Sequence, residues 1–173
     1  MTVDERAARV RLLLLDVDGV MTDGHLYFTA TGEEMKAFHS RDGLGMKLLQ
    51  RAGLQVAIVT ARTARAVDLR AQNLGITLVK QGVEDKRTAL AELARELGFE
   101  LAQCGYMGDD VVDLPVLRAC GFSASVTDGH PLVRRAVDYV SREPAGAGAV
   151  REVCELVLRA QGKLDAALTP YLQ

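Results

Sequence analysis

The stretch LLLLDVDG, residues 12–19, decides how this chain folds. Its four leucines leave no polar position on either side, which is the pattern of a short strand buried on both faces of a parallel sheet. Residues 56–59, VAIV, repeat that pattern. Helical patterns lie between such runs, and this alternation is typical of α/β proteins. The sequence therefore predicts a doubly wound, Rossmann-like parallel sheet with helices on both faces.

Outward from this stretch, the alternation continues to residue 140. Strands are expected at 12–15, 56–59, 76–79, 104–107, 122–126 and 139–140, and helices at 44–51, 64–74, 88–97, 113–120 and 132–136. Gly53, Gly75 and Gly98 each follow a predicted helix, where a left-handed residue commonly ends it. We expect one domain covering residues 1–173.

Residues 24–38, GHLYFTATGEEMKAF, interrupt the alternation. They predict a β-hairpin of two extended arms around a turn near Thr31 and Gly32. An isolated two-stranded hairpin is marginally stable in water, so this insertion is expected to pack against a neighbour. Residues 162–173 are expected to form a C-terminal tail, and no stretch is long enough for a cap domain.

Composition and charge exclude several classes of partner. The net charge is −2 and no Lys/Arg-rich run occurs, which argues against nucleic acid and against an anionic membrane. Cys104, Cys120 and Cys154 form no CxxC pair, so reduced thiols are expected rather than a zinc site or disulfides. The apolar run near the amino end is too short for a signal peptide or a membrane span. We expect a cytoplasmic protein that acts on a small molecule.

Polar residues follow several predicted strands directly. Because ligands of an open parallel sheet bind at the carboxyl ends of its strands, these residues are the first candidates for chemistry. They are Asp16, Asp18, Thr60, Asp109, Asp110 and Asp113, with Lys86 at the start of the helix that precedes the strand at 104–107.

Each candidate also has a purely structural interpretation. Asp18-Gly19 could form a simple turn. Thr60 could cap the next helix. Lys86 could be a solvated helix residue, and Asp109 and Asp110 could cap a helix beginning near residue 113. A calcium loop is excluded for the first segment, since its twelfth position holds Tyr27 rather than Glu. Only the joint pattern favours a functional site.

Crowded carboxylates at one sheet edge would repel by roughly 4 kcal/mol per close pair at an effective dielectric constant of 20. A hard divalent cation offsets this repulsion, and Mg²⁺ commonly combines one or two carboxylates with phosphate oxygens and water. A hydroxyl at Thr60 and an ammonium at Lys86 suit the oxygens of a phosphoryl group. The pattern therefore predicts magnesium-dependent phosphoryl transfer.

The order DVDGVMTDG, VTAR, Lys86 and GDDVVDLP resembles all four motifs of the haloacid dehalogenase superfamily of phosphatases. By that resemblance Asp16 is the nucleophile and Asp18 the general acid and base, with Thr60 and Lys86 completing the catalytic set. The resemblance places Mg²⁺ on Asp16, Asp109 and the backbone carbonyl of Asp18. It gives Asp110 and Asp113 supporting roles around the metal.

Further segments, KAFHSRDGLG, QGVEDK and GAGAVREVCELVLRAQGKLD, resemble the capless family of 3-deoxy-D-manno-octulosonate 8-phosphate phosphatases over almost the whole chain. The resemblance implies release of phosphate from an eight-carbon sugar acid through an aspartyl phosphate, during lipopolysaccharide synthesis. It also implies a homotetramer assembled through the hairpins, with the tail able to fold over a neighbouring site.

Substrate contacts are carried over in the same way. Arg62 and Arg70 are eight residues apart, roughly 12 Å along a helix, so at least one is expected to recognise the sugar or its carboxylate rather than the phosphate. Two departures from the family pattern are Ala61, where Gly is usual, and Lys47, where Arg is frequent. The expected substrate-binding residues are Asp18, His39, Ser40, Arg41, Asp42, Gly43, Lys47, Arg62, Arg70 and Lys86.

Three other interpretations remain. A phosphatase of nine-carbon sialic-type acid 9-phosphates shares the fold, but Arg62 stands where those relatives have Glu, which favours the eight-carbon substrate. A signalling receiver domain also combines acids, Thr, Lys and magnesium, but its phospho-acceptor lies on a later strand than its acidic pair, whereas here DxD ends the first strand. A catalytically silent scaffold is disfavoured by the intact reactive set.

Overall fold

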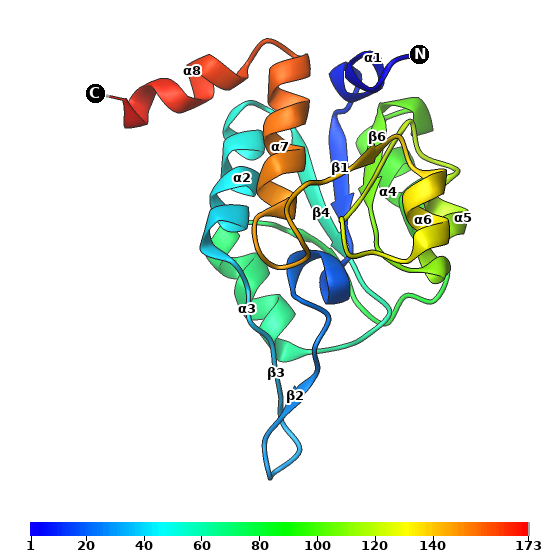
Figure 1. Ribbon diagram of the computed structural model, residues 1–173, viewed down its shortest axis with the longest axis vertical. Coiled ribbons are helices and arrows are strands. Elements are labelled where there is room, and N and C mark those ends of the chain that lie inside the picture. The colour runs from blue at the N-terminus through cyan, green and yellow to red at the C-terminus, as the bar shows by residue number, and fades with distance from the viewer. Residues whose placement is uncertain (173) are drawn as a thin grey trace.

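Six parallel strands form the central sheet in the computed structural model, which describes residues 1–172 (Figure 1). The order across the sheet is β5-β4-β1-β6-β7-β8, and every neighbouring pair runs parallel. The strands are β1 Leu12–Leu15, β4 Gln55–Val59, β5 Leu78–Lys80, β6 Cys104–Met107, β7 Phe122–Ser125 and β8 Tyr139–Val140. The predicted doubly wound sheet is confirmed.

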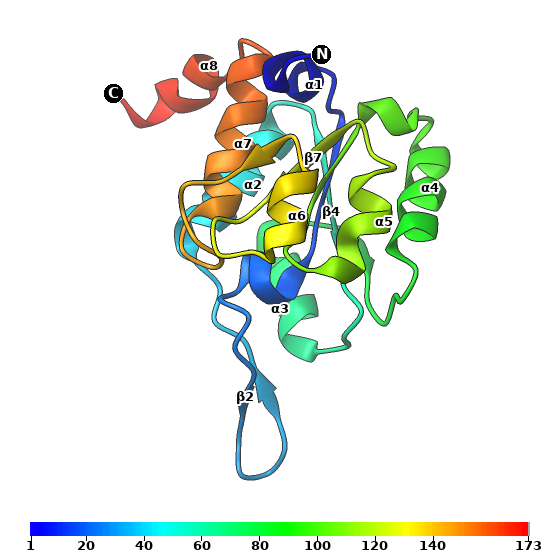
Figure 2. The ribbon, with the colours of Figure 1, turned by 45° about the vertical axis from the view of Figure 1, so that its right-hand side comes forward.

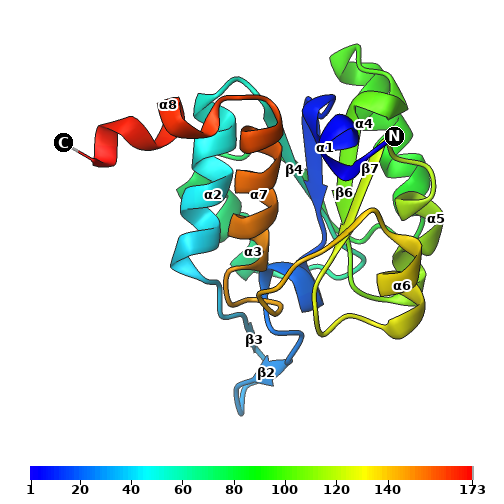
Figure 3. The ribbon, with the colours of Figure 1, turned by 45° about the horizontal axis from the view of Figure 1, so that its top comes forward.

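Helices cover both faces of this sheet (Figure 3). One face packs against α1 Val3–Ala8, α2 Ser40–Arg51, α3 Arg65–Leu74 and α7 Ala149–Ala160. The other face packs against α4 Lys86–Leu97, α5 Leu114–Leu117 and α6 Pro131–Ala136. The chain therefore has two apolar cores, one on each side of the sheet.

The four leucines of β1 divide between these two cores. Leu13 and Leu15 belong to the core beneath α2 and α7, whereas Leu12 and Leu14 belong to the core beneath α4. All four are fully buried. Since burying one Leu side chain contributes about 1.5–3 kcal/mol, this strand fixes the register of the whole sheet.

Several helices differ from the sequence prediction. Helix α2 begins at Ser40, before the expected residue 44, because glycines obscured its apolar pattern. A Cβ at Gly45 would lie 3.0 Å from the Cα of Arg151, so the glycine permits close packing of α2 against α7. Helices α1 and α7 were not predicted as elements. The expected helix 113–120 is shorter, a 3₁₀ turn η3 Val111–Asp113 followed by α5.

The expected tail is helical as far as the structure describes it, and its last residue, 173, lies outside the described residues. It contains α8 Leu164–Leu168 and the 3₁₀ turn η4 Thr169–Tyr171. Leu164 and Leu168 pack against the core, and Arg51 donates a hydrogen bond to the Tyr171 hydroxyl at 2.6 Å. None of the helices within residues 1–172 is both long and apolar enough to cross a bilayer.

The inserted hairpin is present and projects away from the sheet (Figure 2). Strand β2 Tyr27–Phe28 pairs antiparallel with β3 Glu34–Met35 in a separate two-stranded sheet. Gly32 adopts φ +84° in the turn, as expected for a tight reversal. The hairpin thus leaves and rejoins the body of the protein between β1 and α2.

Candidate active site

The predicted reactive residues meet at the carboxyl end of β1, where the strand order reverses. Leu15 lies opposite Ile58 of β4 and Met107 of β6, and the Asp16 amide donates to the Met107 carbonyl at 3.0 Å. Thr60 therefore follows β4 on one side of Asp16, and Asp109 follows β6 on the other. A crevice at such a reversal is the usual ligand site of an open α/β sheet.

A glycine brings the loop after β1 into close contact with Asp109. Asp16 accepts a hydrogen bond on Oδ1 from the Val17 amide at 2.7 Å and so caps the turn η1 Val17–Met21. Within that turn Gly19 has φ +85°, and a Cβ there would lie 2.2 Å from Asp109 Oδ2. Both the backbone conformation and the missing side chain are needed for this approach.

Lys86 is buried between two carboxylates. Its Nζ lies 2.8 Å from Asp16 Oδ2 and 2.7 Å from Asp113 Oδ1, and only 4% of its surface is exposed. Burial opposes its charge, but Asp16 and Asp113 outweigh that effect and raise the pKa of Lys86. The solvated-helix interpretation of Lys86 does not hold, because α4 begins here with the side chain turned into the site.

Asp113 and Asp110 hold the loop after β6 in different ways. The buried Asp113 accepts hydrogen bonds from the Tyr106 hydroxyl at 3.0 Å and from the amides of Asp109 at 3.1 Å and Asp110 at 3.4 Å. The exposed Asp110 instead accepts from the Val111 amide at 2.7 Å and caps η3. Asp113 therefore supports Lys86 directly, whereas Asp110 shapes the backbone.

Carboxylate oxygens of Asp16, Asp109 and Asp113 lie within 4.8 Å of one another. Burial, followed by the charge of Asp113, raises the pKa of Asp16 to about 6; burial, followed by the charge of Asp16, raises the pKa of Asp109 to about 7. Since four donors already occupy Asp113, the remaining capacity belongs to Asp16 and Asp109. This all-oxygen set fits a hard divalent cation such as Mg²⁺.

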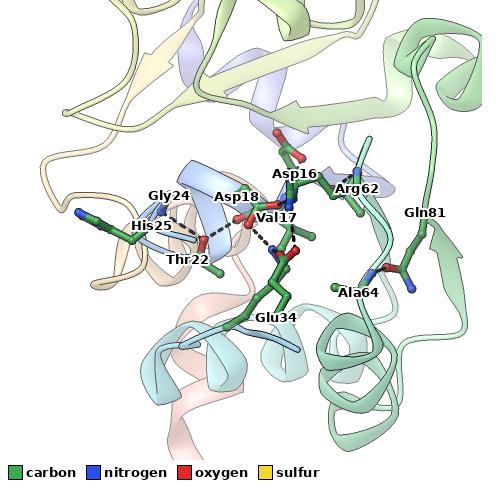
Figure 4. Close-up of polar contacts among 12 residues, drawn as sticks. Asp16, Val17, Asp18, Thr22, Gly24, His25, Glu34, Arg62, Ala64 and Gln81 are labelled. Atoms are coloured by element: carbon green, nitrogen blue, oxygen red, sulfur yellow. Dashed lines mark hydrogen bonds and ion pairs between the residues drawn. The ribbon is translucent and has the colours of Figure 1, made fainter. Parts of the chain in front are cut away.

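Asp18 belongs to an ionic cluster that the sequence did not reveal. Lys36, from the end of the hairpin, donates to Asp18 Oδ1 and lies 2.6 Å from Glu34 Oε1. Arg62 contacts the other oxygen of each carboxylate: its Nη2 lies 2.7 Å from Glu34 Oε2, and its Nε lies 3.9 Å from Asp18 Oδ2 (Figure 4). The only sequence signal was that Glu34 and Lys36 alternate along one arm and so share a side.

Thr60 is not the cap of the following helix. Ala64 holds that position in α3, and its amide donates to Gln81 Oε1 at 2.8 Å (Figure 4). Thr60 is buried, and its Oγ1 accepts from the Arg62 amide at 3.3 Å. The hydroxyl therefore lies at the strand end where a phosphoryl group would bind.

The remaining expected substrate residues form a second group near the start of α2. Arg70 donates a hydrogen bond to the His39 carbonyl at 2.9 Å, and its guanidinium lies 5.6 Å from the centre of the Phe38 ring. A Cβ at Gly43 would lie 2.5 Å from this guanidinium, so the glycine leaves room for it. Burial lowers the pKa of Arg70. This group is built around Arg70, whereas Arg62 is joined to Asp18.

Asp42 and its neighbours point in several directions. The buried Asp42 accepts from the Arg151 amide at 2.8 Å in the first turn of α7, and burial raises the pKa of its carboxyl. Ser40 and Arg41 are exposed, with Arg41 donating to the Ala147 carbonyl at 3.3 Å, and Lys47 is half-buried. The carboxylate of Asp42 thus faces α7.

Comparisons with known proteins agree with this geometry. The haloacid dehalogenase-like hydrolase family matches residues 76–153. The 3-deoxy-D-manno-octulosonate 8-phosphate phosphatase KdsC of Yersinia pestis is 48% identical over 165 residues, covering 95% of this chain and 88% of the relative. The Escherichia coli K12 protein of the same name is 47% identical over 162 residues, covering 94% and 86%.

Two solved structures are similar along nearly their full lengths. The phosphatase of the same name from Moraxella catarrhalis, in complex with magnesium, phosphate and a KDO molecule, has a TM-score of 0.96 and 43% identity, covering 98% of this chain and 97% of that one. The cobalt-bound Haemophilus influenzae phosphatase has a TM-score of 0.92 and 40% identity, covering 97% and 99%. The chain belongs to the haloacid dehalogenase superfamily, in its family of 3-deoxy-D-manno-octulosonate 8-phosphate phosphatases.

Proposed function

We propose that this protein hydrolyses the phosphate monoester of 3-deoxy-D-manno-octulosonate 8-phosphate, giving the free sugar acid and phosphate for lipopolysaccharide synthesis. The observation that carries the proposal is the buried Asp16 at the end of β1, in contact with Lys86 and beside Asp109. A carboxylate held between an ammonium and a cation site is suited to attack phosphorus.

The first half of the reaction transfers the phosphoryl group to the protein. An oxygen of Asp16 bonds to phosphorus in line with the ester oxygen, and the bond between phosphorus and the ester oxygen breaks with its electron pair on that oxygen. Asp18 supplies the proton that makes the sugar a neutral alcohol. Lys86 and Thr60 bind oxygens of the phosphoryl group as its charge shifts.

The second half returns the protein to its starting state. Asp18 takes a proton from water, the water oxygen bonds to the phosphorus of the aspartyl phosphate, and phosphate leaves as the Asp16 carboxylate is restored. Asp16, Asp109 and the backbone carbonyl of Asp18 would hold Mg²⁺, with Asp110 and Asp113 in support. When bound, the cation neutralises negative charge on the phosphoryl oxygens.

The eight-carbon acid is favoured over a nine-carbon acid because Arg62 stands where the resemblance gives the nine-carbon phosphatases Glu. Arg62 is half-exposed beside Asp18 and carries a bidentate donor group suited to carboxylate or sugar oxygens. Arg70, near His39 and Gly43, supplies a second cation within reach of the α2 start. The Moraxella relative was solved with a KDO molecule, which supports the same substrate class.

Phosphate release from the two sugar acid phosphates by purified protein with Mg²⁺ tests this assignment. We expect faster turnover of the eight-carbon ester and none with Asp16→Asn, whose circular dichroism should match the wild type. Preference for the nine-carbon ester would overturn the substrate choice. A stable phosphorylated protein without multiple turnover would instead identify a receiver-like domain.

We also propose that four copies assemble through the hairpins. Apolar side chains gather there in an exposed position: Phe28 is 59% exposed, and Leu26, Tyr27 and Met35 are exposed as well. Such a cluster on a projecting two-stranded sheet is typical of a protein interface. We expect a tetrameric mass in light scattering at micromolar concentration and a smaller particle for Phe28→Ser. A monomeric wild type would contradict the proposal.

A further inference from the structure

The two carboxylate oxygens of Asp18 have different surroundings. Oδ1 accepts a hydrogen bond from Lys36. Oδ2 is buried, and within residues 1–172 no donor is hydrogen-bonded to it, since the Nε of Arg62 lies 3.9 Å away. One oxygen is therefore held by a hydrogen bond, whereas the other has no donor bound to it and can take a proton.

Lys36 is placed to hold Asp18 rather than to bind substrate. Its side chain is 1% exposed, although it comes from an insertion that projects into solvent. Its ammonium is shared between Asp18 and Glu34, and a buried ammonium needs such partners because it has lost its water. With so little surface exposed, Lys36 has no free face for a sugar phosphate.

Glu34 completes the arrangement. Its Oε1 lies 2.6 Å from Lys36 and its Oε2 lies 2.7 Å from Arg62, so one carboxylate joins the hairpin to the segment after β4. The cluster contains two carboxylates and two cations and is neutral in sum. Asp18 is thus held through contacts with two segments that lie outside its own loop.

We propose that Lys36, held by Glu34, is the positioning residue of the general acid and base Asp18. This inference rests on the proposed function, because it assigns a task to the residue that protonates the leaving group. Lys36 fixes Oδ1, and that contact sets the orientation of the carboxylate and leaves Oδ2 to carry the proton. The projecting insertion therefore contributes its own residue to the chemistry of its own chain.

The inference predicts a dependence on the leaving group. A sugar alkoxide must be protonated as it departs, whereas nitrophenolate is a stable anion that leaves without a proton. A misplaced Asp18 should consequently slow the sugar ester far more than 4-nitrophenyl phosphate. For Lys36→Met we expect kcat/KM on the eight-carbon ester to fall about 30-fold, because this ratio reports the transfer to Asp16 alone and general acid catalysis contributes roughly 10²–10⁴-fold.

The same variant should lose less than about fivefold in kcat/KM on 4-nitrophenyl phosphate. Lys36→Arg retains a cation at this position and should restore part of the lost rate. The matched control is Lys80→Met, since Lys80 also pairs with a glutamate, 2.8 Å from Glu92, but with 27% of its side chain exposed. This control should turn over both esters at the wild-type rate. Equal losses of kcat/KM for Lys36→Met on both esters would overturn the proposal.

A crystal structure of Lys36→Met provides a test that needs no turnover. We expect the Asp18 carboxylate to adopt a different rotamer or more than one, with Asp16 and Lys86 unmoved. An unchanged Asp18 would overturn the positioning role even if the variant were slow. Failure of the proposed function is a separate result, seen as absence of phosphate release from the sugar ester by the wild-type protein.

Discussion

Two lysines of this protein, Lys86 and Lys36, each lie between two carboxylates but belong to different parts of the fold. Lys86 lies between Asp16 and Asp113, and Lys36 lies between Asp18 and Glu34; both are almost fully buried. Lys86 begins a helix that packs on the central sheet, whereas Lys36 ends a projecting insertion. Asp16, the proposed nucleophile, is thus held by the scaffold, and Asp18, its proposed acid–base partner, by a segment outside it.

This difference shows which part of the fold holds each lysine in place. The contacts of Lys86 depend on strand ends whose positions are fixed by two apolar cores. Those of Lys36 depend on the path of the hairpin, whose own two-stranded sheet shares no strand with the main one. Damage at Lys86 should therefore affect both folding and catalysis, and damage at Lys36 chiefly the protonation of the leaving group.

The largest effect is expected from Lys86→Met. Loss of its ammonium removes a contact to the transferring group, which should lower kcat by roughly 10³-fold. It also leaves two buried carboxylates facing each other, which should reduce the free energy of unfolding by about 3 kcal/mol in EDTA at pH 8. Phosphate release and urea unfolding measure the two effects. A smaller loss of kcat than in Lys36→Met would break the comparison.

The next effect concerns pH in the absence of metal. The folded-state pKa of Asp16 is raised from 3.8 to about 6, so the folded protein holds a proton that the unfolded chain releases. Protonated Asp16 therefore contributes on the order of 3 kcal/mol to the free energy of unfolding below about pH 4, and this contribution is lost as pH rises to about 6.

Urea unfolding in EDTA across this pH range checks the prediction. Asp16→Asn lacks the titrating group, so its stability relative to wild type should increase as pH rises. Mg²⁺ favours the charged carboxylates and should flatten the wild-type dependence. A constant difference between the two proteins from pH 4 to pH 7 would show that Asp16 titrates normally.

A comparison of two glycine variants distinguishes the cost of backbone strain from the cost of a contact at the site. Gly19 and Gly53 both adopt φ +85°, but a Cβ at Gly19 would meet Asp109, whereas nothing lies within 4 Å of one at Gly53. Each change to Ala should cost about 1–2 kcal/mol of stability from the left-handed backbone. Only Gly19→Ala should also weaken Mg²⁺ binding, by about tenfold or more. Isothermal titration calorimetry measures the Mg²⁺ affinity of both variants. Equal affinities would contradict the prediction.

The smallest effect is expected from Tyr106→Phe. It removes one donor to Asp113, which keeps its contact with Lys86, so the expected losses are about 1 kcal/mol of stability and a few-fold in kcat. Tyr139→Phe removes a comparable bond to Glu152, at 2.6 Å, away from the site. It should destabilise similarly without lowering kcat. Equal kcat values for the two variants would show that Tyr106 has no part in holding Lys86.

Much of the scaffold could be predicted because it depends on local patterns. The leucines of β1 have no polar neighbour within the strand, and the acids that follow such strands must meet at one edge of a parallel sheet. The convergence of Asp16, Thr60, Lys86 and Asp109 follows from chain order and this rule. The prediction for α2 is too short because its glycines serve close packing, Gly43 against Arg70 and Gly45 against α7, rather than helix formation.

The ionic cluster around Asp18 could not be predicted in this way. Its members are separated by up to 44 positions, from Asp18 to Arg62, and their meeting depends on how the hairpin leaves the sheet. Neither residue type nor spacing distinguishes Lys36 from a solvated lysine. The contact of Asp42 with α7 could not be predicted either, because it depends on how α2 is rotated against α7.

Residues 24–38 share no backbone ladder with the six-stranded sheet, and this independence has a consequence for how new specificities arise. Exchange of this insertion between relatives would alter the neighbours of Asp18 while every pairing of β1 is retained. Recombination could therefore vary the surroundings of Asp18 without changing the strand that precedes Asp16. A library that keeps Glu34 and Lys36 and varies the other positions of the insertion would explore substrate range without altering a strand of the main sheet.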